Sequence, residues 1–371
     1  MSPSNNFTGI SSSNASSQVT TSPIPSLASI ELSNLTLSEY AAEVALNPNT
    51  NLLYVSDLFT NNITVVNVTT HAVVTRIELP GTPVSTIVVD PSRNTIYVSV
   101  YGCVNDPNVS NSCKSANFST YQNEGIVRIN ASSNKIIDEI HVNVGDIGLD
   151  PNTNTLWGLC AESLCAINAS SDSLIANISL HASSVGFALD PKVNRVYVAA
   201  CTSMMLACGG AEILGFSENT YELVTNTSLP DFDAVNFGLT VDPASDKVYI
   251  VGLSSQNMTL VSIDGRTGEI LYLSELGSSC SGAGGGTLVF DNVTNEIVVP
   301  FASQQYLLFI NATDGQIADM VAAGLGVQYA YFNSNTQQIY LTENSSLLFL
   351  STSFKQRYVD TSLLQSGICL P

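Results

Sequence analysis

Charge is scarce in this chain, and positive charge is scarcest. Only 11% of its 371 residues are charged, and 31 acidic residues against 11 lysines and arginines give a formal net charge of −20. This excess of negative charge argues against nucleic acids and anionic membranes as partners. Serine, threonine and asparagine must keep the surface polar instead, and such neutral groups hold their state as the pH falls. The composition suits a protein that is exposed to acid or covered in sugar, unless it reflects only drift in a Ser/Asn-rich repeat protein.

Long apolar runs, helical periodicity and familiar catalytic motifs are missing as well. No apolar stretch approaches the length of a membrane helix, so we expect no membrane span. The sequence has no Gly-x-Ser-x-Gly elbow and no His-Glu-x-x-His. The glycine-rich run at 282–286 follows no strand-to-helix pattern and predicts a flexible turn. Met1 is not followed by a signal peptide, so we expect a chain from which an export signal has been removed.

What the chain does have is a repeated motif, a turn that begins with Asp-Pro or Asn-Pro in five clear copies and lacks the Pro in two worn ones, followed by a strand that contains Tyr-Val or a similar pair. Neighbouring copies begin 40 to 60 residues apart. The seven copies are LNPNTNLLYV (46–55), VDPSRNTIYV (89–98), LDPNTNTLWG (149–158), LDPKVNRVYV (189–198), VDPASDKVYI (241–250), FDNVTNEIVV (290–299) and FNSNTQQIYL (332–341). A strand-rich period of this length is typical of propeller blades.

Each repeat predicts a four-stranded antiparallel sheet. An apolar run precedes the turn, the Tyr-Val strand follows it, and a third strand such as GIVRIN (125–130) and a fourth such as VVTRIEL (73–79) complete the unit. One such sheet cannot bury both of its faces, whereas seven packed around an axis can. We therefore predict an all-β fold, a seven-bladed β-propeller domain at 27–371 with its blades at about 40–365. A flexible Ser/Thr/Asn/Pro-rich segment at 1–26 precedes it.

The pattern D/N-P-x-x-x-x-(L/I/V)-Y-V resembles that of the YVTN family of seven-bladed propellers. The likeness covers roughly residues 40–365, and it is strong in five repeats and degenerate in those at 290–299 and 332–341. It implies the propeller fold and an extracellular setting. Members of the family range from surface and adhesion proteins to relatives of enzyme propellers, and the matching positions are turn and core positions. The resemblance therefore implies no catalytic residue.

The ends of the chain supply one strand more than seven blades need. We expect QRYVDTS (356–362) to be the fourth strand of the last blade, which leaves an extra strand at about 27–34. That strand either pairs with an outer blade edge of its own ring or adds to a blade of a neighbouring subunit. The second arrangement is head-to-tail and would propagate into a filament. The short connection from Leu35 to Tyr40 favours pairing within one ring.

The eight cysteines agree with an oxidising compartment. Three close pairs follow the second strands of consecutive blades, and a fourth pair would pin the C-terminal tail to the ring. We expect the disulfides Cys103–Cys113, Cys160–Cys165, Cys201–Cys208 and Cys280–Cys369. The rival interpretation is metal binding, but no pair has the C-x₂-C spacing of a zinc site. We therefore expect no metal and no other cofactor, apart from covalent N-glycans.

Acceptor sites for those glycans are abundant. Asn-x-Ser/Thr sequons occur at Asn6, Asn14, Asn34, Asn62, Asn67, Asn108, Asn117, Asn130, Asn168, Asn177, Asn226, Asn257, Asn292, Asn311 and Asn344. The 15 sites are about twice what chance would give from this composition. Four of them, Asn67, Asn130, Asn168 and Asn311, fall at the same turn between third and fourth strands. Repeat duplication could also have copied a sequon that is not used.

A ligand site is expected at one mouth of the central channel, where propellers usually place one. Alignment of the repeats puts His141, His181 and Asp233 at equivalent positions at the start of inner strands. A few residues further on, the channel-lining positions include Glu43, Asp146 and Tyr329. These six residues are the candidate ligand-binding set. The alternative is a ring of solvated rim residues with no ligand, and no catalytic residue is assigned.

Two classes of function follow. The first is a secreted or cell-surface glycoprotein with a structural or binding role, such as an envelope component, an adhesin or an extracellular filament subunit. Its partners would be other surface proteins, copies of itself, or carbohydrate. The second is a secreted propeller enzyme, a hydrolase or lyase acting at the channel mouth. Low charge with many sequons is also associated with surface proteins of acid-loving archaea, but this is an association and not a derivation.

Overall fold

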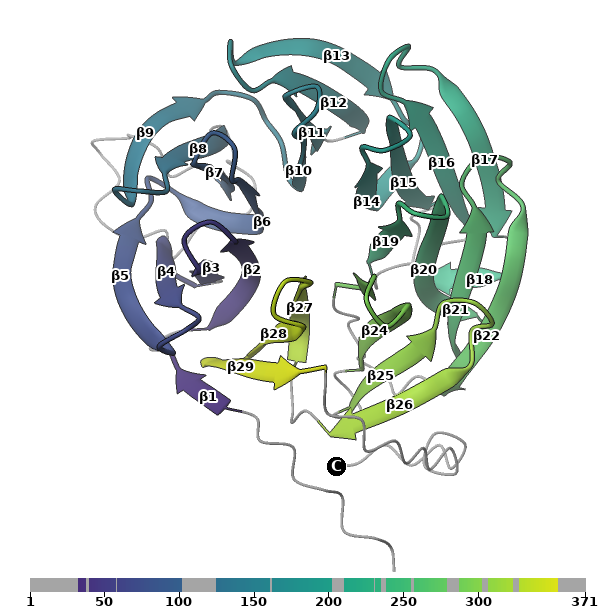
Figure 1. The fold of residues 1–371 in the computed structure, drawn as a ribbon. Helices are drawn as coiled ribbons and strands as arrows, with labels where there is room; N and C mark the ends of the chain where they lie inside the picture. Colours follow the sequence, from purple (N-terminus) through teal and green to yellow (C-terminus); the bar gives the residue numbers. More distant parts are fainter. Residues whose placement is uncertain are drawn as a thin grey trace, which may run out of the picture.

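The computed structural model describes residues 33–37, 40–57, 59–101, 125–160, 162–201, 210–229, 231–234, 238–254, 257–278, 287–301, 306–322 and 327–352. These residues form seven antiparallel sheets arranged as blades around a central axis (Figure 1). No helix that is long and apolar enough to cross a membrane occurs among them. The prediction of an all-β, seven-bladed propeller is confirmed.

The blades are numbered in chain order. Blade I contains β2 (Ala41–Asn47), β3 (Leu52–Asp57), β4 (Asn62–Asn67) and β5 (Ala72–Glu78). Blade II contains β6 (Thr82–Asp90), β7 (Thr95–Tyr101), β8 (Gly125–Asn130) and β9 (Lys135–Ile140). Blade III contains β10 (Ile147–Asp150), β11 (Thr155–Cys160), β12 (Ser163–Asn168) and β13 (Ser173–Ser179). Blade IV contains β14 (Ser183–Asp190), β15 (Arg195–Cys201), β16 (Ala211–Ser217) and β17 (Leu223–Leu229).

Blade V has its inner strand in two pieces, β18 (Phe232–Ala234) and β19 (Leu239–Asp242), followed by β20 (Lys247–Ser254), β21 (Asn257–Asp264) and β22 (Ile270–Ser278). Blade VI contains β23 (Val289–Asp291), β24 (Glu296–Phe301), β25 (Tyr306–Asn311) and β26 (Ile317–Ala322). Blade VII contains β27 (Val327–Asn333), β28 (Gln338–Glu343), β29 (Ser346–Ser351) and β1 (Ser33–Thr36). The innermost strands contact one another around the ring, from β2 and β6 to β23, β27 and back to β2.

The N-terminal strand closes the ring. β1 pairs antiparallel with β29, with Ser33 opposite Phe349 and Thr36 opposite Ser346. Beyond the strand, the Leu37 N–H donates to the Ser345 carbonyl at 2.6 Å, and the Leu37 side chain is buried in the core between blades VII and I. Pairing of the extra strand within its own ring is thus confirmed in Figure 1, at Ser33–Thr36. Residues 26–32 lie outside the described residues.

The expectation that residues 356–362 complete the last blade is wrong. β1 occupies the free edge of β29, so the fourth-strand position in blade VII is already filled. Residues 356–362 themselves lie outside the described part of the chain. The segments at 27–34 and 356–362 both have the alternating pattern of an edge strand. Periodicity alone does not say which of them pairs with β29.

The repeat motif is explained by its turn. In blade II the Asp90 Oδ1 atom accepts hydrogen bonds from the Ser92 and Arg93 N–H groups, at 2.9 and 3.0 Å. The fifth residue, counted from the Asp or Asn that begins the turn, is in the left-handed region in all seven blades, at Asn51, Asn94, Asn154, Asn194, Asp246, Asn295 and Gln337. Asn and Asp tolerate that conformation better than other non-glycine residues. The motif thus specifies a capped tight turn.

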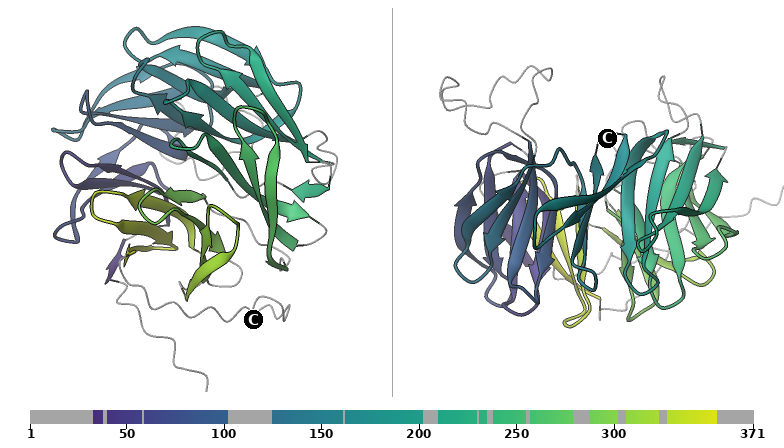
Figure 2. Two further views of the ribbon diagram at one scale, coloured as in Figure 1. Left: turned by 45° about the vertical axis from the view of Figure 1, so that its right-hand side comes forward. Right: turned by 90° about the horizontal axis from the view of Figure 1, so that it is seen from above.

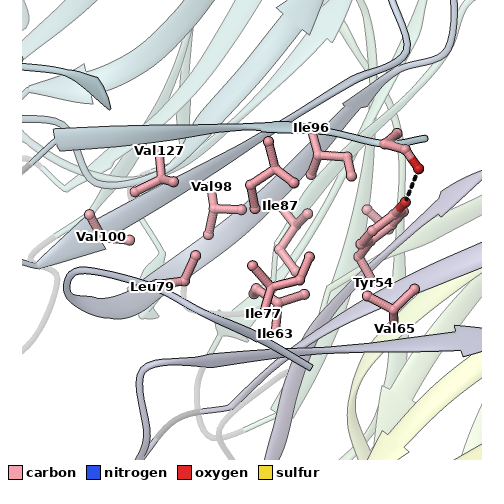
Figure 3. Packing of buried hydrophobic residues seen from close by; sticks show 13 residues of the cluster. Tyr54, Ile63, Val65, Ile77, Leu79, Ile87, Ile96, Val98, Val100 and Val127 are labelled. Carbon is pink, nitrogen blue, oxygen red and sulfur yellow. Dashed lines mark hydrogen bonds between the residues drawn. The ribbon is translucent and has the colours of Figure 1, made fainter. Parts of the chain in front are cut away.

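The core lies between blades rather than within one. The largest fully buried side chains are Trp157 and the second-strand tyrosines Tyr54, Tyr97, Tyr197, Tyr249 and Tyr340. Figure 3 shows one interface, in which Tyr54, Ile63 and Ile77 of blade I pack against Ile96 and Val98 of blade II. Burial of such apolar surface contributes about 25 cal/mol per Å².

In blades I, IV and V the second-strand tyrosine hydroxyl also reaches a turn of the next blade. The Tyr249 hydroxyl donates to the Ala312 carbonyl at 3.2 Å, and the Tyr54 hydroxyl lies 3.4 Å from the Ala131 carbonyl. The Tyr197 hydroxyl donates to the buried Asp246 carboxylate at 2.8 Å. We call these contacts the cross-blade clasps. They join an apolar core to a polar turn at each interface where they occur.

The clasps predict a ranking of Tyr→Phe substitutions. Tyr197→Phe removes the hydroxyl donor from Oδ1 of the buried Asp246 carboxylate and leaves it the Arg266 Nε–H bond to Oδ2 at 3.2 Å. We therefore expect a loss of about 1.5–3 kcal/mol in the free energy of unfolding. Tyr249→Phe removes one of two hydrogen bonds to a neutral carbonyl, because the Tyr272 hydroxyl also donates to the Ala312 carbonyl at 3.2 Å. A loss of about 0.5–1.5 kcal/mol is expected. Denaturant unfolding of the two variants tests the ranking, and an equal or larger loss for Tyr249→Phe would contradict it.

Ring closure is tested at Leu37. Leu37→Ala should lower the free energy of unfolding by about 2–5 kcal/mol, because it empties a buried site beside β29. Thr36→Ser is the control, since Thr36 is the exposed last residue of β1 and Ser preserves the Asn34 sequon. A change within about 0.5 kcal/mol is expected. Similar losses for both variants would mean that the Leu37 side chain does not hold the closure.

Candidate functional site

The two ends of the propeller differ in what they carry. Because the strands of each blade alternate in direction, the first-to-second and third-to-fourth turns lie at one end, which we call the turn face. The second-to-third connections and the links between blades lie at the other end, the loop face. Figure 2 shows the ring from the side, with its two ends apart. Inner strands run from the loop face to the turn face, so residues at their starts lie near the loop-face mouth of the channel.

Four blades place a polar group at that mouth. Glu43 is in β2, Thr86 is in β6, Asp146 immediately precedes β10, and Tyr329 is in β27. The Thr86 hydroxyl donates to Asp146 Oδ1 at 3.1 Å. The charges of Glu43 and Asp146 both act on the Tyr329 hydroxyl. We call these four residues the channel cluster, which brings together three of the six residues predicted from sequence.

Backbone irregularity aims these side chains. The pairing of β2 with β3 shifts between Ala41 and Val44, around Glu43, and that of β6 with β7 shifts between Pro83 and Ile87, around Thr86. The pairing of β27 with β28 shifts just before Tyr329. β-Bulges of this kind re-aim side chains at the rims of closed sheets.

The environment changes the protonation of the channel cluster. Burial, and then the neighbouring Asp146 charge, raise the pKa of the Glu43 carboxyl well above its ordinary value of 4.5. Burial, then Glu43 and Asp146, raise the pKa of Tyr329 to about 12. The cluster can therefore offer a protonated carboxyl and a phenol as donors, and Asp146 Oδ1 already accepts a hydrogen bond from Thr86 beside them. This donor and acceptor set is suited to hydroxyl groups of a ligand.

The other three candidates are not joined to the cluster. His141 and His181 are exposed residues in the links that lead to blades III and IV. Neither has a hydrogen bond or an ion pair with the channel cluster within the described residues. Asp233 lies in β18, and its side chain is outside the described set. No group of three or more His, Cys, Asp or Glu side chains that could hold a metal ion occurs in the described part of the chain.

Sequence reasoning missed an aromatic pair at the loop face. Phe59, in the connection between β3 and β4, is 77% exposed, and its ring lies 5.3 Å from that of Tyr40 in an edge-to-face arrangement. Tyr40 immediately precedes β2, the strand that carries Glu43. A phenylalanine in the short connection at 58–61, between Leu58 and Thr60, was the available signal. Exposed aromatic rings beside polar groups can cover the apolar face of a ligand.

The described residues include three of the eight cysteines for which disulfides were predicted. A disulfide joins Cys160 and Cys165 across the hairpin of β11 and β12, with Cα atoms 5.9 Å apart. Cys201 is also disulfide-bonded, and its predicted partner Cys208 lies outside the described residues. The predicted pairs Cys103–Cys113 and Cys280–Cys369 fall wholly outside them.

Eleven of the fifteen sequon asparagines are described, and none is buried. The exceptions Asn6, Asn14, Asn108 and Asn117 lie outside the described residues. Asn67, Asn130, Asn168 and Asn311 end the third strands of their blades, as predicted. Asn34, Asn177 and Asn226 are exposed on the outer strands β1, β13 and β17. Asn62, Asn257, Asn292 and Asn344 are at or beside turns.

Comparison with known proteins supports the fold alone. No protein-family model matches the sequence, and no curated protein sequence matches it. Among the solved structures that match is one titled Kuenenia stuttgartiensis Hydrazine Synthase. Its TM-score is 0.69 at 10% sequence identity, and the match covers 86% of this chain and 97% of that one. At this identity the likeness shows the seven-bladed propeller architecture and no shared chemistry.

The channel cluster predicts a gain in stability on Glu43→Gln. Because the folded state keeps a proton on Glu43 that the unfolded chain releases above pH 4.5, the free energy of unfolding falls as the pH rises past that value. Glu43→Gln removes this loss, so its melting temperature should exceed that of the unmodified protein at neutral pH and approach it in acid. Glu78→Gln, on an exposed position of β5, is the control. A Glu43→Gln variant that melts lower at neutral pH would contradict the assignment.

Proposed function

We propose that the chain is an extracellular or cell-surface glycoprotein, a propeller of the YVTN type, with a structural or binding role. The observation that carries this proposal is the disulfide between Cys160 and Cys165, together with the bonded state of Cys201. Disulfides form and persist mainly in oxidising compartments outside the cytosol. An envelope component, an adhesin and an extracellular filament subunit are the roles that suit such a chain.

The sequons in the turns between third and fourth strands support the proposal less than those on the outer strands. In blades II, III and VI the sequon Ser or Thr accepts a hydrogen bond from an asparagine of the neighbouring turn, as Ser132 does from Asn94 at 2.5 Å. The sequon asparagine caps the same turn, as Asn130 Oδ1 does for the Ser132 N–H at 3.0 Å. Asp264 caps the equivalent turn of blade V without a sequon. These turn sequons therefore have a structural origin of their own.

The outer-strand sequons lack that explanation and carry more weight. Asn177 in β13 and Asn226 in β17 occupy the same place in blades III and IV, opposite Cys165 and Leu214 of the third strands. Both side chains are exposed on the outer wall. Asn-x-Ser recurs there although no turn requires it. A glycan on either residue would extend into solvent.

The loop-face mouth is the proposed binding region. The channel cluster supplies hydrogen-bond donors and acceptors, and the Tyr40–Phe59 pair supplies exposed aromatic surface in the same blade as Glu43. A hydroxyl-rich ligand such as a carbohydrate needs both kinds of contact. Surface proteins or further copies of this chain are the other proposed partners.

An enzyme is the second candidate, and one observation favours it. Burial, and then the neighbouring Asp146 charge, raise the pKa of the Glu43 carboxyl well above its ordinary value, as a general acid requires, and Asp146 places a second carboxyl in the same cluster. A hydrolase or lyase at the channel mouth would use this pair. Cleavage of oligosaccharides that is lost in both Glu43→Gln and Asp146→Asn would establish this candidate, whereas binding without cleavage supports the first.

Glycosylation is tested at one sequon by three substitutions. Glycopeptide mass spectrometry of protein from its native source should find a sugar mass on Asn226. Asn226→Gln and Ser228→Ala should both remove it, because each breaks the acceptor sequence. Ser228→Thr should retain it, because Thr preserves that sequence.

The same preparation tests the compartment through non-reducing peptide mapping. A linked Cys160–Cys165 peptide is expected. Unmodified asparagine at every exposed sequon, together with free thiols at Cys160 and Cys165, would overturn the proposed function.

A further inference from the structure

One blade interface carries an acid where its counterparts carry small residues. The residue that follows the third strand lies beneath the second-strand aromatic of the preceding blade. In blades I to VI this residue is Val68, Ala131, Ala169, Glu218, Gly265 and Ala312. Glu218 is the exception, and its aromatic neighbour is Trp157 of blade III in place of the usual tyrosine. The acid is not a surface variant, because Glu218 is only 6% exposed.

Glu218 lies among further buried carboxyl groups. Asp150, which ends β10, and Asp190, which ends β14, are both fully buried, and each caps the turn that follows it. Both Glu218 oxygens, Trp157 Nε1 and Asp190 Oδ2 are buried without a hydrogen bond of normal geometry in the part of the chain that the structure describes. Among the neighbouring acids, Asp150 has the largest effect on the pKa of Glu218.

Positive charge does not compensate this cluster. Among the groups acting on Asp190, Lys192 is the cation, and it is exposed, while Asp246 of blade V adds a further negative charge. Glu222, in the same turn as Glu218, is exposed. Three ionised carboxylates at this depth would repel one another without the shielding of water. Burial, then Asp150, accordingly raise the pKa of Glu218 to about 9.

We propose that Glu218 holds a proton in the folded protein and acts as a proton-dependent latch between blades III and IV. The protonated carboxyl donates toward Asp150 beneath the Trp157 ring, in the position that a tyrosine hydroxyl serves at other interfaces. Release of the proton would leave a buried carboxylate against Asp150 and loosen the interface. The latch therefore tunes the ring to acidic surroundings. It does not depend on glycosylation or on a ligand at the channel mouth.

The sign of the pH dependence follows from the two states. The unfolded chain releases the Glu218 proton near the ordinary value of 4.5, whereas the folded chain keeps it to about 9. Over that window the folded state binds more protons, so stability falls as pH rises, by up to about tenfold in the folding equilibrium constant per pH unit. Below the window Glu218 is protonated in both states and the effect vanishes.

Glu218→Gln tests the latch. The variant keeps the shape of the protonated acid and cannot ionise, so its folding equilibrium constant should fall less steeply with pH than that of the unmodified protein. Comparison of the two curves cancels the contributions of Glu43 and Asp190, which are common to both. Glu222→Gln is the matched control and should reproduce the slope of the unmodified protein. If Glu218→Gln cannot be folded, Glu218→Ala replaces it, because alanine occupies this position in three blades.

Trp157 gives a direct readout, since it is the single tryptophan of the chain. Its emission should change with a midpoint near pH 9 in the folded protein, and this change should be absent in Glu218→Gln. Parallel slopes for the two proteins, or an unchanged emission titration in the variant, would overturn the proposal. A melting temperature that calcium raises in the unmodified protein and not in Glu218→Gln would also overturn it, in favour of a bound cation.

Discussion

The contact between a second-strand aromatic side chain and the next blade's turn is the interaction on which this propeller depends. It buries the largest side chains of the core and also gives a buried turn a hydrogen-bond partner, as Tyr249 does for Ala312 and Tyr197 does for Asp246. Blades I, IV and V thereby fix a polar turn of the next blade as well as its apolar face. Between blades II and III the arrangement varies, because an Arg128–Asp172 ion pair lies beside Tyr97.

This constraint falls mainly on one end of the ring, the turn face. The turn face is held by caps, left-handed residues and links between turns, such as the bond from Asn49 to the Pro91 carbonyl at 2.9 Å. Substitutions in the turns of this face would disturb a cross-blade clasp. The loop face carries no clasp among the described residues, so inner strands can bulge and present Glu43, Thr86 and Tyr329 to the channel. Functional variation is therefore expected at the loop face.

Sequence reasoning succeeded where one motif repeats and failed where a residue departs from it. The turn motif and the Tyr-Val strand predicted seven blades, and alignment on the motif placed Glu43, Asp146 and Tyr329 at one mouth. The origin of the last outer strand was missed, because both chain ends have strand-like alternation and only pairing distinguishes them. Glu218 was missed because a buried acid and an exposed one look alike until the ring above it, Trp157, is known. The positions of His141 and His181 could not be predicted, because both residues lie in links between blades and no motif constrains those links.

Native-state hydrogen exchange of the whole protein in mild acid tests the central claim that the clasps and the β1 closure make one cooperative ring. The account predicts that the most protected amides of the second and third strands in all seven blades exchange through a single common opening, with the same free energy and the same dependence on denaturant. Blades that open separately, each with its own free energy, would contradict it.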